Sequence, residues 1–418
     1  MKVLVLGAGV IGVTTAWYLA EEGHTVAIVD RREAPALETS FANGGQISAG
    51  HAEPWANPQA PAKILRWIWR DDAPLLFRLH LDPHQWMWGA RFLAECLPAR
   101  ARDNIAQLVR LALYSRESLR ELRASTGIAY DELTRGILLF YTERGAFEHA
   151  VGTAELMRAY GLDRVPKTID EAIAIEPALA SARDRIVGAT YTASDESGDA
   201  HLFTQRLADK IMARGGEFHA RRDIVRLEVE GGRIAAVRVR DPGGAEHLLE
   251  ADAYVVALAA YSPLVTRPIG LDLPVYPAKG YSASVPVRDP AKAPCVSLTD
   301  DAAKIVITRL GNRMRIAGTA ELAGYSLDLN PVRCEALIHR TRELFPEAAH
   351  YGEATFWTGL RPSTPSNVPI IGPTRFGNLY INTGHGTLGW TLACGSGRAL
   401  AAIISGRKPA VDFRFSHA

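Results

Sequence analysis

Three glycines near the start of the chain have the spacing that brings a backbone close to a phosphate. Gly7, Gly9 and Gly12 form a GxGxxG motif. In such a motif the first glycine permits a tight turn, the second lets the backbone approach a pyrophosphate, and the third lets a helix pack on a strand. Asp30 follows 18 residues after Gly12, where a carboxylate accepts hydrogen bonds from ribose hydroxyls. This combination predicts a dinucleotide site.

Two strands and one helix must position these residues. Lys2–Leu6 and Thr25–Val29 are short apolar runs, typical of buried parallel strands. Between them, Val13–Glu22 reads as a helix that stops at Gly23. The helix N-terminus would offer free N–H groups and a positive dipole end to the phosphates. The first thirty residues therefore predict a strand–helix–strand unit of the Rossmann type.

The motif alone does not choose between FAD and NAD, but later segments favour FAD. Asp199 is a good N-cap for a helix, and a hairpin with alternating apolar residues follows over 225–239. NAD dehydrogenases seldom need such an insertion. Near the C-terminus, the strand Leu379–Asn382 leads into a glycine-rich loop over 383–390 and then a helix to about Ser405. The N-terminus of that helix would stabilise the negative charge of a reduced flavin.

Composition and charge exclude several classes of protein. The chain has 418 residues with ordinary globular composition, 47% hydrophobic and 22% charged. Its net charge of +1 provides no field to attract nucleic acid, and its four scattered cysteines lack metal-ligand spacing. Glycines interrupt the apolar N-terminal stretch, so we interpret it as strand and helix rather than as a signal peptide or membrane span. We expect a cytoplasmic protein without metal, and leave open peripheral attachment to the cytoplasmic face of the inner membrane.

Six segments in a fixed order carry a resemblance to a known family. They are GAGVIGVTTAWYLA at 7–20, ETSFANGGQIS at 38–48, residues 195–205, YPAKGYS at 276–282, residues 355–362 and NTGHGTLGW at 382–390. GxGxxG is generic, but the later motifs are specific. The chain resembles the bacterial FAD-dependent D-amino-acid dehydrogenase (small subunit) family, within the D-amino-acid oxidase and glycine oxidase superfamily. The resemblance implies an α/β fold, with a Rossmann-like FAD-binding domain and a smaller substrate domain built on an antiparallel sheet.

The resemblance also implies which residues bind FAD, without a covalent bond. The ADP half would contact the first turn, the second strand and later backbone segments. The flavin ring would contact the polar loop after the second strand and the glycine-rich loop near the C-terminus. The implied cofactor residues are Gly7, Gly9, Val10, Ile11, Gly12, Asp30, Arg31, Ser40, Asn43, Gly44, Gly45, Gln46, Ile47, Ile224, Ala257, Ala260, Gly359, Gly384, His385, Gly386, Thr387, Leu388 and Gly389.

A substrate site is implied as well. Arg361 matches the superfamily arginine that binds the substrate carboxylate, and Tyr281 would face the substrate as a second catalytic residue. A guanidinium suits the first role because it binds a carboxylate through two parallel hydrogen bonds. The alternatives are a structural salt bridge for Arg361 and a core tyrosine for Tyr281. His51, Lys279 and His385 are further candidates for the substrate pocket.

The implied reaction is FAD-dependent oxidative deamination of D-amino acids resembling D-alanine, an oxidoreductase reaction on CH–NH₂ donors. A hydride would leave Cα for flavin N5, and the imino acid would hydrolyse to a 2-oxo acid and ammonia. Electrons would pass to a non-oxygen acceptor such as a quinone. Three alternatives stay open: an enzyme for secondary amino acids (D-proline, hydroxyproline or sarcosine), an NAD dehydrogenase, and a non-catalytic flavin electron-transfer module.

Residues 48–51 depart from the family in a way that concerns specificity. The family usually has Ser-Pro-Gly-Tyr there, whereas this chain has Ser-Ala-Gly-His. The changed side chains lie just beyond the implied flavin loop. They therefore put the preferred substrate side chain in question more than the reaction type.

The order of the segments predicts a discontinuous domain organisation. Strands of an antiparallel sheet are expected over 137–141, 281–287, 304–308 and 313–318. An amphipathic helix with apolar residues between 105 and 122 is expected in a mainly helical segment. We assign the FAD-binding domain to 1–50, 190–265 and 350–418, the helical segment to 51–126, and the substrate domain to 127–189 and 266–349.

Tryptophans are concentrated near the N-terminus. Six of the eight lie within the first 88 residues, and five of these fall in the helical segment, at positions 55, 67, 69, 86 and 88. Lys63, Arg66 and Arg70 are close to them in sequence. Trp-rich elements beside basic residues can seat a protein on a membrane surface, although core packing is the simpler interpretation.

Overall fold

A six-stranded sheet forms the centre of one lobe in the computed structural model, which describes residues 1–67, 75–78 and 80–417. Its strand order is β19-β20-β13-β1-β2-β9, and all neighbours are parallel except β19 and β20. The short apolar sequences of β1 and β13 suit strands buried on both faces. The strands are β1 (Lys2–Leu6), β2 (Thr25–Val29), β9 (Glu217–His219), β13 (Ala253–Val256), β19 (Ile370–Pro373) and β20 (Leu379–Thr383).

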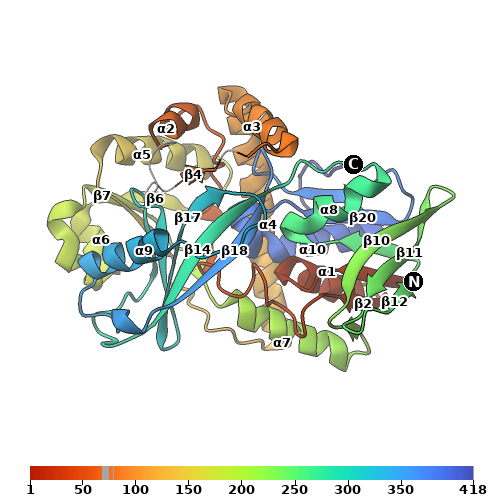
Figure 1. Ribbon diagram of the computed structural model, residues 1–418. Helices are drawn as coiled ribbons and strands as arrows, with labels where there is room; N and C mark the ends of the chain where they lie inside the picture. Colours follow the sequence, from red (N-terminus) through yellow and green to blue (C-terminus); the bar gives the residue numbers. More distant parts are fainter. Residues whose placement is uncertain (68–74, 79, 418) are drawn as a thin grey trace.

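Helices cover one face of this sheet. α1 (Val10–Glu21) packs between α7 (Ala200–Ala213) and α10 (Gly389–Ile404), and α10 packs in turn on α4 (Pro98–Thr126). Two glycines of α10 make the close contact feasible, because a Cβ at Gly395 or Gly397 would lie within 3 Å of α4 or α1. Long α4 runs through the middle of the molecule, behind both lobes (Figure 1). We call this unit the parallel-sheet lobe.

A small antiparallel sheet covers the opposite face of the parallel-sheet lobe. Its strands are β10 (Asp223–Glu230), β11 (Arg233–Arg240) and β12 (Glu246–Leu249). Leu227 and Val237 of this sheet share a buried cluster with Leu4 and Tyr254 of the large sheet. Helix α8 (Ser262–Thr266) follows β13 nearby. The hairpin expected from the alternating residues is thus present.

A nine-stranded, mostly antiparallel sheet forms the second lobe, which we call the antiparallel-sheet lobe. The order is β18-β14-β17-β16-β15-β5-β7-β6, and β4 pairs with β17 beside this path. The strands are β4 (Leu75–Phe77), β5 (Ile137–Tyr141), β6 (Arg164–Lys167), β7 (Gly188–Thr192), β14 (Tyr276–Pro286), β15 (Ser297–Asp300), β16 (Ile305–Leu310), β17 (Arg313–Leu322) and β18 (Thr355–Ser363). The pair β3 (Gln46–Ile47) and β8 (Glu196–Ser197) lies apart from it.

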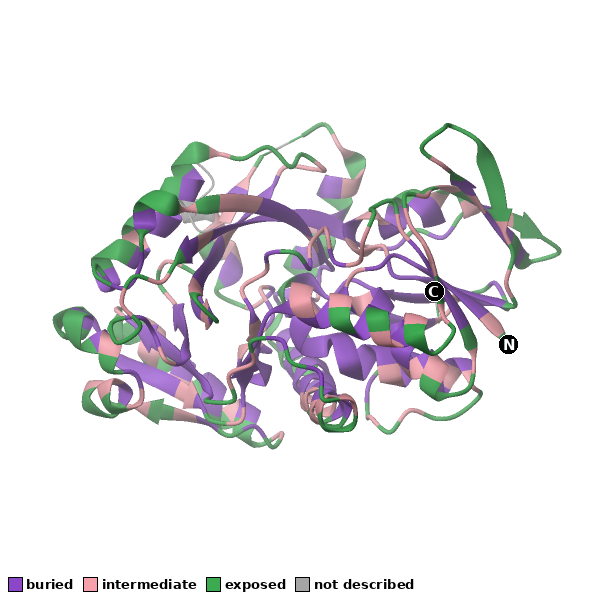
Figure 2. Ribbon diagram, turned by 90° about the horizontal axis from the view of Figure 1, so that it is seen from below, coloured by how far each residue is buried: buried purple, intermediate pink, exposed green. Residues whose placement is uncertain are grey.

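Helices also shield the antiparallel-sheet lobe. α9 (Pro331–Leu344) buries Leu337 and Ile338 against one face of the sheet. α6 (Ile169–Ile175) lies on the same side, while α2 (Ala60–Trp67), α3 (Pro83–Glu95) and α5 (Arg144–Arg158) gather at one end of the lobe (Figure 1). The helices carry exposed residues on their outer faces, and the sheets between them are buried (Figure 2). The opposite face of the long strands is left for the site described below.

The expected elements are present, with one difference in the assignment of a segment. β1, β2 and β5 have the bounds read from the sequence, and Asp199 caps α7 by accepting hydrogen bonds from the N–H groups of His201 and Leu202. However, β18 pairs with β14 along its whole length. Residues 355–363 therefore belong to the antiparallel sheet, and not to the FAD-binding part that we assigned from residue 350. The remaining domain boundaries stay a prediction.

The clustered tryptophans have different surroundings. Trp17 and Trp88 are buried, Trp55 is half-buried, and Trp86 is 56% exposed. Trp69 and the side chain of Trp67 lie outside the described residues. Within the described residues, no helix is both long and apolar enough to cross a membrane.

Candidate active site

A cavity of about 670 Å³ lies between the two lobes. The turn between β1 and α1 contributes to its wall, as do the loop after β2, the loop before α10, and strands β14, β17 and β18. Arg361, Tyr281, His51 and His385 of the expected substrate site line it. The expected cofactor residues that line it are Gly7, Gly9, Val10, Ile11, Asp30, Arg31, Ser40, Asn43, Gly44, Gly45, Gln46, Ile224, Ala257, Gly359, His385, Gly386, Thr387, Leu388 and Gly389.

Five expected site residues do not line the cavity. Gly12 instead lets α1 pack on the turn, because a Cβ there would lie 1.8 Å from the Gly7 carbonyl oxygen. Ile47 and Ala260 are buried behind the wall. Gly384 has φ +82°, so it serves the turn before the loop. Lys279 is also buried away from the cavity, as described below.

The glycine turn has the conformation that a pyrophosphate site requires. Gly7 has φ +108°, and a Cβ there would lie 2.6 Å from the Ala257 carbonyl oxygen, so glycine is needed on two grounds. Gly9 is the N-cap of α1 and has no side chain of its own to cap the helix. Ser40 Oγ accepts a hydrogen bond from the Val10 N–H at 3.0 Å. The cavity end of α1 therefore presents backbone donors and a positive dipole end, which fits an anionic diphosphate.

Asp30 and Arg31 lie beside this turn. The Asp30 carboxylate accepts hydrogen bonds from the N–H groups of Ala8 (2.7 Å) and Arg32 (2.8 Å), and burial raises its pKa. Its remaining lone pairs suit ribose hydroxyls. The Arg31 guanidinium donates to Glu38 at 2.5 Å and lies 4.2 Å from the centre of a tyrosine ring. Arg31 is therefore held in place beside the turn, and its contact with adenosine stays a prediction.

Strands of the opposite lobe hold the polar loop after β2. Arg315, which is buried, donates to the Asn43 carbonyl oxygen at 3.1 Å, and Thr308 Oγ1 donates to the Gly44 carbonyl oxygen at 2.7 Å. The Gln46 side-chain amide donates to Ser297 Oγ at 2.9 Å. The antiparallel-sheet lobe thus holds the loop in place, and Asn43, Gly44 and Gln46 line the cavity.

The loop before α10 forms a dry part of the wall. His385 is fully buried, and its Nε2 lies 3.1 Å from Ser396 Oγ. Its Nδ1 has no hydrogen-bond partner within the described part of the chain. Burial lowers the pKa of His385 to about 3, so the imidazole is neutral. This environment supports a packing role for the neutral His385 side chain rather than a role in acid–base catalysis.

Arg361 points a buried, unneutralised guanidinium into the cavity. Its side chain extends from β18 across β14, and the absence of a side chain at Gly280 leaves space for it. A Cβ at Gly280 would lie 2.3–2.4 Å from the guanidinium. Among the described residues its only hydrogen-bond partner is the Thr319 carbonyl oxygen, at 2.8 Å. Burial and the nearby charge of Arg333 lower the pKa of Arg361 to about 10, which still leaves it protonated at neutral pH. The remaining N–H donors are free for an anion.

Thr319 is a site residue that the sequence does not reveal. It lines the cavity with φ +56°, a conformation that is strained for a β-branched residue. Its buried Oγ1 has no hydrogen-bond partner in residues 1–67, 75–78 and 80–417. In this conformation its carbonyl oxygen accepts the hydrogen bond from Arg361. No signal in the sequence marks a threonine for this conformation.

Tyr281 differs from its expected role. Its ring belongs to the buried cluster beneath α9, and its hydroxyl donates to Glu321 Oε2 at 2.5 Å. Lys279 Nζ lies 3.4 Å from the same carboxylate and donates to the Asp328 carbonyl oxygen. The expected catalytic role of Tyr281 and pocket role of Lys279 are therefore not supported, because both polar ends are engaged with Glu321. The alternative of a core tyrosine with a satisfied hydroxyl describes Tyr281 better.

His51 is tied to a buried acid. His51 Nδ1 lies 2.8 Å from Ser48 Oγ, which in turn lies 2.5 Å from Asp195 Oδ2. Asp195 also accepts hydrogen bonds from the N–H groups of Ala49 and Gly50. Burial raises the pKa of Asp195 to about 6, so the carboxyl is ionised above that pH.

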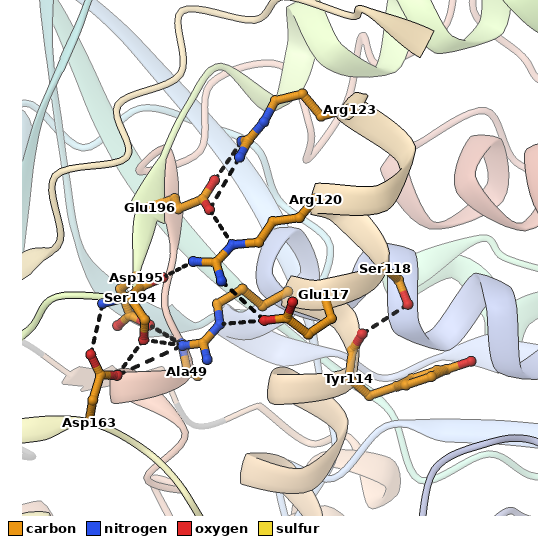
Figure 3. A network of polar contacts seen from close by, with 11 residues as sticks. Ala49, Tyr114, Glu117, Ser118, Arg120, Arg123, Asp163, Ser194, Asp195 and Glu196 are labelled. Atoms are coloured by element: carbon orange, nitrogen blue, oxygen red, sulfur yellow. Dashed lines mark hydrogen bonds and ion pairs between the residues drawn. The ribbon is translucent and has the colours of Figure 1, made fainter. Parts of the chain in front are cut away.

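Arginines of α4 surround the segment that carries Asp195 (Figure 3). Arg116 Nη1 lies 3.9 Å from Asp195 Oδ1. Arg120 and Arg123 bind the neighbouring Glu196 carboxylate at 2.8 and 2.6 Å. This network fixes β8 against α4 and thereby fixes the position of the acid behind Ser48.

Comparisons with known proteins identify the family of the chain. The family described as DAO, FAD dependent oxidoreductase, matches residues 2–403. The D-amino acid dehydrogenase of Dechloromonas aromatica is 57% identical over 415 residues, with 99% of each chain covered. That of Paramagnetospirillum magneticum is 53% identical, covering 99% of this chain and 97% of the relative.

Solved structures share the fold at low identity. L-proline dehydrogenase from P. horikoshii has a TM-score of 0.76 at 17% identity, covering 98% of this chain and 95% of that one. Glycine oxidase from Bacillus cereus has a TM-score of 0.73 at 22% identity, covering 99% and 98%. The cofactor of this enzyme is FAD, since the family is FAD-dependent and the cavity carries the turn and loops that fit it. The chain belongs to the DAO family of FAD-dependent oxidoreductases, alongside relatives named D-amino acid dehydrogenase.

Proposed function

We propose that this enzyme oxidatively deaminates D-amino acids of the D-alanine type to 2-oxo acids and ammonia. The observation that carries the proposal is the buried Arg361 guanidinium, which faces the cavity without an acidic partner among the described residues. A buried cation of this kind calls for an anionic ligand. A substrate carboxylate meets that need through two parallel hydrogen bonds. The names of the close relatives support a D-amino acid as the substrate.

The residues of the chain contribute mainly by positioning. Bound FAD supplies a hydride acceptor. Arg361 holds the carboxylate and thereby restricts where the Cα–H bond points, which can supply much of the barrier reduction. The substrate amine must be neutral so that its lone pair can form the C=N bond as the hydride leaves. Water then hydrolyses the released imino acid.

The Arg361→Leu variant tests this function. Loss of a charge-assisted pair is worth roughly 1.5–3 kcal/mol per hydrogen bond, so we expect kcat/KM for D-alanine to fall by about 100-fold or more. Arg375→Leu, an arginine that binds the Ile269 carbonyl oxygen outside the cavity, is the control. Unchanged turnover by Arg361→Leu would sink the assignment. A panel that includes D-proline, hydroxyproline and sarcosine separates the proposed substrate from secondary amino acids.

We further infer that the enzyme passes its electrons to a quinone at a membrane surface, to which α3 binds. The outer face of α3 and the turn after it expose Trp86, Met87, Leu93 and Leu97 at 44–58%. Exposed Arg91 lies on the same helix. An exposed apolar face with Trp beside an arginine suits an interface with anionic lipid.

Vesicle binding tests whether α3 binds a membrane surface. FAD-loaded enzyme is mixed with phosphatidylglycerol vesicles, sedimented, and assayed with a soluble quinone and with oxygen. We expect the Leu93→Glu variant to stay in the supernatant while the wild type sediments. Val332→Glu, at a residue that is 55% exposed on α9, is the matched control. Wild type that never sediments, or that reduces oxygen faster than the quinone, contradicts the inference.

A further inference from the structure

The chain from Asp195 through Ser48 to His51 leaves one nitrogen unexplained. Ser48 and Asp195 are buried, and the two contacts between the three side chains measure 2.5 and 2.8 Å. His51 lines the cavity, but its Nε2 is buried and has no hydrogen-bond partner among the residues that the structure describes. A buried polar atom without a partner needs an explanation, because leaving it unpaired is destabilising.

Counting protons along this chain fixes the state of the imidazole. The Asp195 carboxylate accepts from two backbone N–H groups, and when ionised it can only accept from Ser48. The single hydroxyl proton of Ser48 therefore points to Asp195. Ser48 Oγ must then accept from His51, so that Nδ1 carries the proton of the neutral ring. Nε2 is consequently an acceptor with a free lone pair.

The charged neighbours do not supply a donor to this lone pair. Arg164 uses its N–H groups on the Gly50 carbonyl oxygen and on two hydroxyl groups, those of Tyr141 and Thr190. Lys304 binds Asp301 at 2.6 Å. Glu53 faces His149, and its carboxylate has no proton to give at neutral pH. Among the described residues no group donates to this lone pair, and a molecule in the cavity that His51 lines can supply the donor.

We propose that His51 Nε2 accepts a hydrogen bond from the α-amino group of the substrate, and that Ser48 and Asp195 position it for that contact. This inference rests on the proposed function and names a second anchor beside Arg361. Two anchors, one for the carboxylate and one for the amine, leave Cα with a single orientation. In this tautomer the Nε2 of His51 can only accept a hydrogen bond.

The contact strengthens as the reaction proceeds. The neutral amine carries two N–H bonds, and the Cα–H bond breaks with its electron pair, which goes to FAD as hydride. The nitrogen lone pair forms the C=N bond, and the nitrogen becomes cationic while it keeps both protons. An N–H on a cationic nitrogen is a better donor than one on an amine, so an unprotonated acceptor stabilises the transition state more than the ground state. Burial, Arg164 and Lys304 lower the pKa of His51 to about 3, which keeps it an acceptor at neutral pH.

Two inhibitors that differ by one amino group isolate this contact. Benzoate offers only a carboxylate, and anthranilate, which occurs in a complex of the structural neighbour L-amino acid deaminase from Proteus myxofaciens, adds an amine beside it. Neither has a Cα–H bond to oxidise. Their dissociation constants are measured from flavin absorbance changes of the FAD-loaded wild type, His51→Phe and Ser48→Ala. His339→Phe, at an exposed position on α9, is the control.

The expected result is a change in the ratio of the two affinities. His51→Phe should weaken anthranilate by about three- to tenfold, the worth of one neutral hydrogen bond, while benzoate affinity stays the same. Ser48→Ala should move the ratio in the same direction, because the ring loses its fixed tautomer. A ratio that does not change in His51→Phe overturns the proposal. Wild type that binds neither carboxylate overturns the proposed function, and this inference with it.

A measurement on the wild type removes dependence on the folding of the variants. Nitrogen NMR of the FAD-loaded enzyme labelled at histidine reports which ring nitrogen of His51 carries the proton. We expect a protonated Nδ1 and an unprotonated Nε2, whose signal shifts when anthranilate binds and not when benzoate binds. A protonated Nε2 contradicts the proton count and overturns the proposal.

Discussion

Replacing Gly280 with alanine tests whether the position of Arg361 determines activity. A Cβ at residue 280 lies 2.3–2.4 Å from Cζ, Nη1 and Nη2 of Arg361. Carbon contacts require about 3.5–4.0 Å, so the guanidinium must move by more than about 1 Å and away from the Thr319 carbonyl oxygen. A misplacement of about 1 Å can lower a rate by about 100-fold. We predict that Gly280→Ala lowers kcat/KM for D-alanine by about that factor.

The assay separates this effect from a loss of folding. Since the obstructed atoms are the end of a flexible side chain, the fold adapts, and we expect FAD content and Tm close to those of the wild type. Gly152→Ala, on an exposed position of α5 where a Cβ meets nothing within 4 Å, is the matched control. Normal kcat/KM in a folded, FAD-loaded Gly280→Ala protein would refute the claim that Arg361 must lie over Gly280.

Two further predictions concern pH and cofactor affinity. His51 and His385 are held neutral with pKa values of about 3, against about 6.5 unfolded, so unfolding takes up protons and stability falls as pH drops below about 6.5. Asp195, with its pKa raised to about 6, offsets part of this loss between about pH 6 and 4. Urea unfolding at pH 6.5 and 4.5 should show that the free energy of unfolding falls by roughly 3 kcal/mol over this range. The fall should be smaller for His385→Gln, and an equal fall in the variant contradicts a neutral, buried His385. Asp30→Asn should weaken FAD binding by about 10- to 100-fold, measured by flavin fluorescence, whereas the exposed Asp412→Asn should not; equal affinities would exclude the ribose contact.

Local patterns predicted the dinucleotide half of the molecule well. The strands Lys2–Leu6 and Thr25–Val29 have the bounds that their apolar runs indicate. Gly7 has the positive φ that its motif implies, and the Asp199 cap begins a helix where expected. These features depend on residues near one another in the chain, so hydrophobic spacing and capping chemistry determine them.

Long-range features could not be read in the same way. Tyr281 looks like a site residue in its motif, but its hydroxyl is taken by Glu321, forty residues later. Ser48 and Asp195 are 147 residues apart, so the chain that orients His51 exists only in the folded protein. Thr319 lies in a strained conformation that its residue type disfavours. Where tertiary contacts overrule local preference, the sequence carries no signal of the outcome.

Anaerobic reduction of the bound flavin is the measurement that tests the central claim most directly. The FAD-loaded enzyme is mixed with D-alanine, L-alanine, D-proline and sarcosine in turn, without oxygen, and the visible absorbance is followed. We predict rapid bleaching by D-alanine, much slower bleaching by the others, and no rapid bleaching by D-alanine in Arg361→Leu. Equal bleaching by L-alanine, or none by any amino acid, would contradict the proposed function.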